Sequence, residues 1–254
     1  MKKYLSILTA ILLATGALMA QLPQGRTSAT IIADALAQLP ADNQTRYHRT
    51  MTDLVSTGEQ GLLDLIGRMN PPGNRSNEAL DYAISAWTNF VANDDAKRAV
   101  AINAFGKALN QSLDNEIKAF VIRQLGQIGT DNNVETLSAF LKDTRLSAPA
   151  VQALASIGSE KANQAIVATL SDNVPDAVKL NLVNALGQTG YSQAESTLLS
   201  ALTQNSSAEL NNALLTALGN LGSRSALTPL KNAAEKINYS YQLNNNATAS
   251  YLSL

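Results

Sequence analysis

The side chains that could do acid–base or metal chemistry are few in this sequence. His48 is its single histidine, and the 254 residues include no cysteine. A zinc site needs three or four such ligands, and a catalytic nucleophile needs a base beside it. We therefore interpret His48 as an exposed side chain or one near a helix cap, and not as a metal ligand or a general base.

Acidic side chains form three local groups that could be read as carboxylate sites. These are Asp94 with Asp95, Glu59 with Asp64, and the segment 131–135, which holds two acids and two asparagines. Paired carboxylates could do acid–base catalysis, and an oxygen-rich loop could hold a cation. Carboxylates at a turn that enters a helix more commonly cap it, and the third group lacks the glycine and spacing of a calcium loop. The sequence thus predicts no catalytic, metal-binding or cofactor-binding residue.

Three aromatic side chains are candidates for binding a partner protein or a sugar: Tyr191, Trp87 and Tyr82. Trp87 is the only tryptophan, and it shares a helical face with Leu80 and Ile84. That face favours a place for Trp87 in a core between helices. Tyr191 is the stronger surface candidate, because the other copies of the repeat described below carry Thr or Ser at its turn.

A short repeated motif, which we call the repeated phrase, predicts the helices that position these side chains. It is a leucine followed four residues later by a glycine. Its copies occupy residues 125–129, 154–158, 186–190 and 218–222. The closing glycines recur with a period of about 30 residues, which is typical of stacked helical hairpins. The residues four and eight positions before each closing glycine are apolar and share one helical face. The phrase therefore predicts an amphipathic first helix that its closing glycine ends in the left-handed conformation.

A second helix follows each closing glycine in the same register. Apolar residues lie eight and twelve positions after the glycine, and alanines that would allow a close helix crossing lie four positions after it in three copies, at Ala162, Ala194 and Ala226. Short hydroxyl side chains suited to capping the second helix are Thr130, Ser159, Ser192 and Ser223. One hairpin cannot offset its ordering entropy, so neighbouring hairpins must bury each other's faces.

Fainter copies extend the array towards the N-terminus. Residues 54–58 repeat the phrase, and residues 77–109 supply another hairpin, whose second helix contains Val100, Ile102, Phe105 and Leu109. Residues 27–39 form a further helix, and the Asn-Pro-Pro-Gly-Asn segment at 70–74 predicts a loop. Pro229 should bend the last second helix or shorten its first turn.

These patterns predict an all-α fold, an α-solenoid of about six helical hairpins. Its expected parts are a signal peptide at 1–20, a capping helix at 21–42, the repeat array at 43–236 and the start of a truncated helical unit at 237–254.

The pattern over residues 115–236 resembles HEAT repeats of the short bacterial kind that is related to phycobilisome lyase repeats. The resemblance implies an armadillo-like helical stack. This sequence departs from the pattern because it lacks the aspartate and arginine that many HEAT units place at fixed helix positions. Such repeats also occur in phycobilin lyases and alkylpurine glycosylases, so the resemblance leaves a lyase-like enzyme open as an alternative.

The opening region, with Arg26-Thr27 before a helix and residues 70–73 before the next unit, also resembles the N-terminal repeats of certain exported bacterial proteins. In those proteins a 3-keto-disaccharide hydrolase-type domain follows, so the resemblance implies a carbohydrate-related context. A further alternative is therefore that this chain is part of a carbohydrate-processing enzyme. A new helical pattern begins at Ala247 and stops at Leu254, from which we expect a longer polypeptide or a shortened gene product.

The first twenty residues are typical of a bacterial secretory signal. Lys2 and Lys3 precede an apolar stretch, 5–13, that is short for a membrane span. We expect cleavage after Ala20, with cleavage after Ala17 or an uncleaved anchor as alternatives, and no lipid-modified cysteine. Without Lys2 and Lys3, 17 of the 19 basic side chains remain against 20 acidic ones, a net charge of −3.

This charge gives no basic stripe for binding nucleic acid. We therefore expect an exported, periplasmic or extracellular scaffold that is not itself an enzyme, uses no cofactor and does not insert stably into a membrane once cleaved. Its expected partner is a protein or a missing C-terminal domain, with a carbohydrate also open. In a purely architectural alternative, the array is a spacer that holds a C-terminal enzyme away from the membrane.

Overall fold

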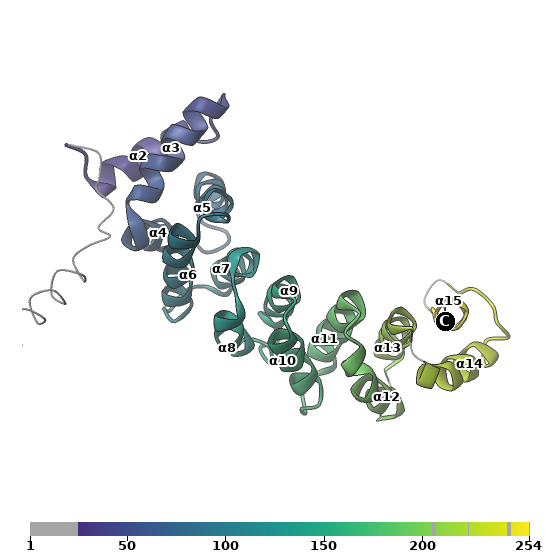
Figure 1. The fold of residues 1–254 in the computed structure, drawn as a ribbon. Coiled ribbons are helices and arrows are strands. Elements are labelled where there is room, and N and C mark those ends of the chain that lie inside the picture. The colour runs from purple at the N-terminus through teal and green to yellow at the C-terminus, as the bar shows by residue number, and fades with distance from the viewer. Residues whose placement is uncertain (1–24, 205–206, 223, 243–244, 254) are drawn as a thin grey trace, which may run out of the picture. The chain divides into compact units, whose positions relative to one another are not determined.

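The computed structural model describes residues 25–204, 207–222, 224–242 and 245–253. The expected signal peptide and the expected cap Ser223 lie outside these residues. The regular elements of the described part are helices, with one isolated bridge between Gln242 and Asn245 (Figure 1). The described part of the chain divides into two compact units. The first is formed by residues 25–69 and 76–104, and the second by residues 70–75 and the described residues from 105 onward.

The first unit packs four helices against one another around a common core. They are α2 (Ser28–Gln38), α3 (Gln44–Ser56), α4 (Gly58–Gly67) and α5 (Glu78–Val91). Helix α2 begins after Thr27, whose hydroxyl oxygen accepts a hydrogen bond from the Thr30 amide, 3.2 Å away. No helix lies between α4 and α5, which confirms the loop predicted from the paired prolines at 71–72.

Helix α6 (Asp95–Leu109) is the second helix predicted within residues 77–109. Val100 and Ile102 are only half-buried, whereas the buried stripe consists of Ala101, Ala104 and Ala108 together with Phe105 and Leu109. The buried face of this helix is therefore formed by three alanines as well as by two large side chains.

The second unit is a row of hairpins in the predicted order of first helix, turn, second helix. Its first helices are α7 (Asn115–Ile128), α9 (Ser147–Ile157), α11 (Asp176–Thr189), α13 (Ala208–Leu221) and α15 (Ala247–Leu252). Its second helices are α8 (Val134–Ser138), α10 (Glu160–Leu170), α12 (Glu195–Gln204) and α14 (Leu227–Glu235). Three of the second helices follow a short 3-10 turn, at Asp131–Asn133, Ser192–Ala194 and Arg224–Ala226.

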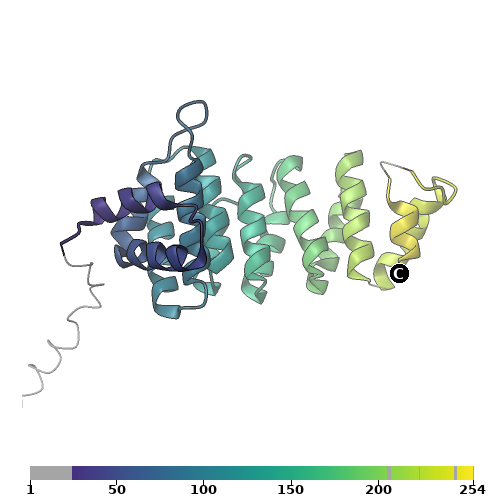
Figure 2. The ribbon, with the colours of Figure 1, turned by 90° about the horizontal axis from the view of Figure 1, so that it is seen from above.

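Successive first helices pack closely against one another, more so than successive second helices. Figure 2 shows the helices of the second unit following one another in a row. In three of the four copies the residue three positions before the closing glycine is itself a glycine, which we call the inner glycine, and its missing side chain makes this approach possible. A Cβ atom on Gly126 would lie 2.6 Å from the Ala153 Cα atom, and one on Gly187 would lie 2.9 Å from the Ala217 Cα atom. Contacts this short are not tolerated between carbon atoms, so the inner glycine fixes the spacing of the first helices.

The closing glycines end the first helices largely as predicted. Gly158, Gly190 and Gly222 have left-handed backbones with φ of 65°, 64° and 66°. The prediction is wrong for Gly129, which is extended with φ of −67°. Glycine is still required there, because a Cβ atom would lie 2.6 Å from the carbonyl oxygen of Leu125.

The predicted caps have mixed outcomes. Ser159 caps α10 by accepting a hydrogen bond from the Ala162 amide at 3.2 Å, and the Thr130 amide donates to Asn133 Oδ1 at 2.9 Å in a reciprocal cap. Ser192 is not a cap, because the 3-10 turn starts one residue earlier than expected and places Tyr191 at the cap position. Helix α14 begins two residues before Pro229, at the same repeat position as α8 and α12, so an effect of Pro229 on its first turn stays a prediction.

The predicted apolar register is confirmed where the copies agree most. The leucines four positions before the closing glycines are fully buried, and so are the three alanines predicted for a close helix crossing. Burial of these residues on successive helices forms the continuous core that a single hairpin cannot make.

Candidate functional site

His48 lies exposed on α3, as predicted. Its Nδ1 atom is 3.5 Å from the Thr52 hydroxyl oxygen, and its ring meets that of Phe90 edge-on with centroids 5.3 Å apart. Among the described residues, no three His, Asp or Glu side chains lie close enough together to hold a metal ion. The structure thus gives His48 an aromatic neighbour and a hydroxyl contact, not a set of ligands.

The acidic groups cap and pair locally, as the sequence favours. Asp94 accepts a hydrogen bond from the Lys97 amide at 3.1 Å and pairs with the Lys97 ammonium at 2.7 Å, while Asp95 pairs with Arg98 at 2.7 Å. The hydrogen bond from the Lys97 side chain is the main reason that the pKa of Asp94 is lowered. Asp64 likewise accepts a hydrogen bond from Gln60, 2.8 Å away on its own helix.

The aromatic candidates of the first unit divide between core and surface. Trp87 is 0% exposed, so the core interpretation is confirmed and this side chain is not available to a partner. Its Nε1 atom has no hydrogen-bond partner among the described residues. Tyr82 is 38% exposed. The pKa of its neighbour Tyr47 is raised, mainly because Tyr47 is partly buried and to a smaller extent because Tyr82 can also carry a negative charge. Partner binding by Tyr82 stays a prediction.

Tyr191 is half-buried and joins two successive hairpins. Its hydroxyl donates a hydrogen bond to Glu160 Oε1 at 2.6 Å. This bond is the main reason that the pKa of Tyr191 is raised. Equivalent contacts occur elsewhere along this edge, since Lys161 donates to the Asp131 carbonyl oxygen and Ser225 donates to Glu195. A role of Tyr191 in partner binding stays a prediction.

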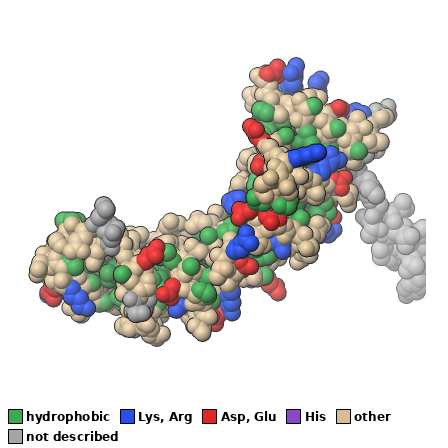
Figure 3. Space-filling model, turned by 180° about the vertical axis from the view of Figure 1, so that it is seen from behind, with side chains coloured by type: hydrophobic (Ala, Val, Ile, Leu, Met, Phe, Trp, Pro, Cys, Tyr) green, Lys and Arg blue, Asp and Glu red, His purple; other side chains and the backbone are tan. Residues whose placement is uncertain are grey.

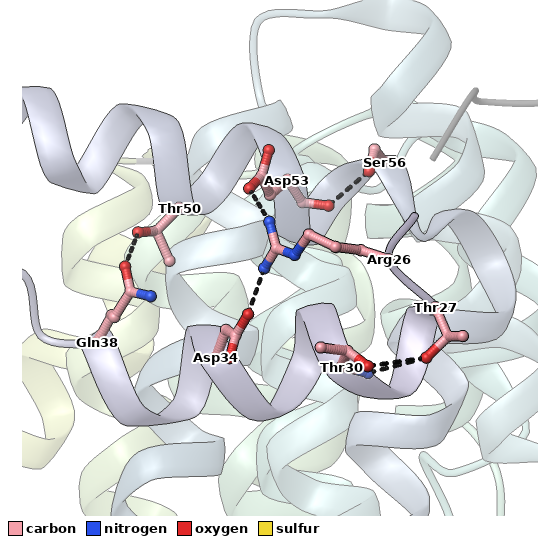
Figure 4. Close-up of polar contacts among 8 residues, drawn as sticks. All are labelled: Arg26, Thr27, Thr30, Asp34, Gln38, Thr50, Asp53 and Ser56. Carbon is pink, nitrogen blue, oxygen red and sulfur yellow. Dashed lines mark hydrogen bonds and ion pairs between the residues drawn. The ribbon is translucent and has the colours of Figure 1, made fainter. Parts of the chain in front are cut away.

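Arg26 holds α2 and α3 together in the first unit (Figure 4). Its guanidinium donates to Asp34 on α2 and to Asp53 on α3, both at 2.6 Å, and these two bonds raise its pKa. Beside it, Thr50 donates to Gln38 at 3.2 Å. A cavity of about 310 Å³ adjoins this network. Both carboxylates already bind the guanidinium, so we interpret the network as a structural link between the two helices and not as a ligand site.

A second small cavity, of about 290 Å³, lies in the second unit between α10, α11 and α12. Polar side chains line much of it, including Ser171, Lys179, Ser196 and Ser200. Lys179 lies 3.8 Å from Asp176, and the nearby Asp172 pairs with Lys142 at 3.0 Å. Local ion pairs therefore already neutralise the charges around this cavity.

The most extended feature is a surface that we call the first-helix face, formed by the exposed sides of α7, α9, α11 and α13. Two rows of side chains cross it. The residues of the first row lie two positions before each closing glycine, and those of the second row lie six positions before it. The first row is Gln127, Ser156, Gln188 and Asn220, and the second row is Arg123, Gln152, Asn184 and Thr216. All are exposed except Thr216, which is half-buried.

These rows combine hydrogen-bonding capacity with little charge. Five of the eight side chains are amides, two are hydroxyls and only Arg123 is charged. On the side that Figure 3 shows, the surface of the second unit consists mostly of uncharged side chains and backbone, with charged side chains in small groups. Sequence reasoning missed these rows because it followed the apolar register. The same alignment of the four repeats, examined at its polar positions, would have found them.

A protein family whose model matches this chain has been identified. The HEAT repeats family matches residues 102–179 and 163–242, which together span more than half of the chain. An engineered protein of known crystal structure is 20% identical, with a TM-score of 0.43 over 82% of this chain and 96% of its own. No curated protein matches the chain. No helix among the described residues is both long and apolar enough to cross a bilayer.

The family match covers the hairpins whose first helices, glycine turns and second helices share one register in sequence and in structure. It also covers the first-helix face, from Arg123 to Asn220. The chain therefore belongs to the HEAT repeat family.

Proposed function

We propose that this chain is an exported, non-catalytic scaffold that binds a partner protein along the first-helix face of its second unit. HEAT repeats generally mediate protein interactions. The observation that carries the proposal is the pair of exposed polar rows across four successive first helices. These rows lie on regular helices with a packed core beneath them, so binding a partner does not require the backbone that carries them to become ordered.

Export and domain context are part of the same proposal. A charged start and a short apolar stretch within residues 1–20 support a cleaved signal peptide and a periplasmic or extracellular location. The likeness of the opening region to repeats that precede a sugar-processing domain supports docking of such a domain in a parent protein.

Site-specific photo-crosslinking in the source cells tests the binding face. A photoreactive residue placed at Asn184, on the first-helix face, should capture a specific protein. The same residue placed at Gln164, an equally exposed position on the second helix α10, should not. Equal capture from both positions, or from neither, would contradict the proposal.

Two further measurements test export and the absence of catalysis. N-terminal sequencing of the protein recovered from outside the cytoplasm should begin at Gln21. The purified chain should not turn over disaccharide substrates. Turnover that is abolished by changing a single carboxylate would identify an enzyme and overturn the proposal.

A further inference from the structure

We draw no further inference here: the strongest candidate, the surface patch of exposed apolar and tyrosine side chains that α14, α15 and the segment between them present at Leu227, Tyr239, Tyr241 and Leu252, carries none because nothing in the structure shows what covers it.

Discussion

The hydrogen bond from the Tyr191 hydroxyl to Glu160 shows how single side chains connect successive hairpins. The bond spans two repeats at the edge where the second helices begin, and it raises the pKa of Tyr191 above the usual 10.0 because the neutral phenol is the donor. A group with a raised folded-state pKa adds stability that is fully present below its unfolded pKa. That stability is lost as the pH rises through the folded pKa.

We therefore predict that Tyr191→Phe lowers the Tm slightly at about pH 8 and that the difference from the unchanged chain shrinks towards about pH 11. Thermal unfolding of both proteins across this range measures the effect. Comparing the two proteins removes the contribution of the other tyrosines that titrate there. Tyr241→Phe, which changes a tyrosine that is 75% exposed, is the control and should show no pH-dependent difference. A gap for Tyr191→Phe that stays constant with pH would contradict this account of the bond.

Arg26 is the corresponding link in the first unit, since one guanidinium bonds carboxylates on two helices. Arg26→Ala should increase amide hydrogen exchange at Ile31 and Ile32 on α2, and this increase should become smaller in high salt, which already screens the ion pairs. Arg46→Ala is a matched control, because it removes an exposed pair within one turn of chain, with Asp42 at 3.0 Å. Equal effects of the two substitutions would show that the bridge between helices adds nothing beyond an ordinary surface pair.

At the scale of helices, the packing of first helices depends on glycines that have no side chain to clash. Gly126 and Gly187 are buried in the helix interior, where glycine is intrinsically unfavourable by about 1 kcal/mol relative to alanine. The close approach of the neighbouring helix accounts for their presence. The inner glycine of the repeated phrase is thus a packing residue, whereas the closing glycine is a terminator.

A matched pair of substitutions separates these effects. Gly126→Ala should destabilise the chain by about 1–3 kcal/mol, because its new methyl group would force α7 and α9 apart. Gly106→Ala in α6 should instead stabilise it, by up to about 1 kcal/mol, since no atom lies within 4 Å of the new Cβ position. Denaturant unfolding of both variants gives the two free energies. Stabilisation by Gly126→Ala would show that the first helices are less tightly packed than the structure has them.

The sequence predicts the helices well and the site poorly, for physical reasons. Large apolar residues at a helical period mark the buried face, and they place the hairpins from residue 115 onward correctly. The buried alanines of α6 are not marked by large apolar residues, and the left-handed end predicted at Gly129 is wrong, because there a short contact and not handedness requires glycine. The apolar pattern does not reveal the two rows that begin at Gln127 and Arg123. An exposed polar residue can serve many roles, and its recurrence is seen only when the repeats are aligned.

At the scale of the second unit, contacts run mainly between adjacent hairpins. Helix α13 packs on α11 and α15 and on the second helix α12, whereas α7 packs on α9. The stability of such an array is approximately a sum of hairpin and neighbour terms. A destabilising substitution in one hairpin should therefore also destabilise its neighbours, and this effect should decrease with distance along the row. The distant part of a binding face that several repeats form would then stay ordered.

This locality can be measured in the full chain with one buried leucine. Leu218→Ala removes a fully buried side chain from α13 and should cost about 2–5 kcal/mol. Hydrogen exchange should accelerate most in α13, less in α11 and not measurably in α7. The reciprocal change, Leu125→Ala in α7, should show the reverse order, since Leu125 is equally buried at the same repeat position. If both variants instead lost protection equally in α7 and α13, the unit would unfold as one cooperative body, and a partner bound at one end of the first-helix face would stabilise the other end as strongly as its own.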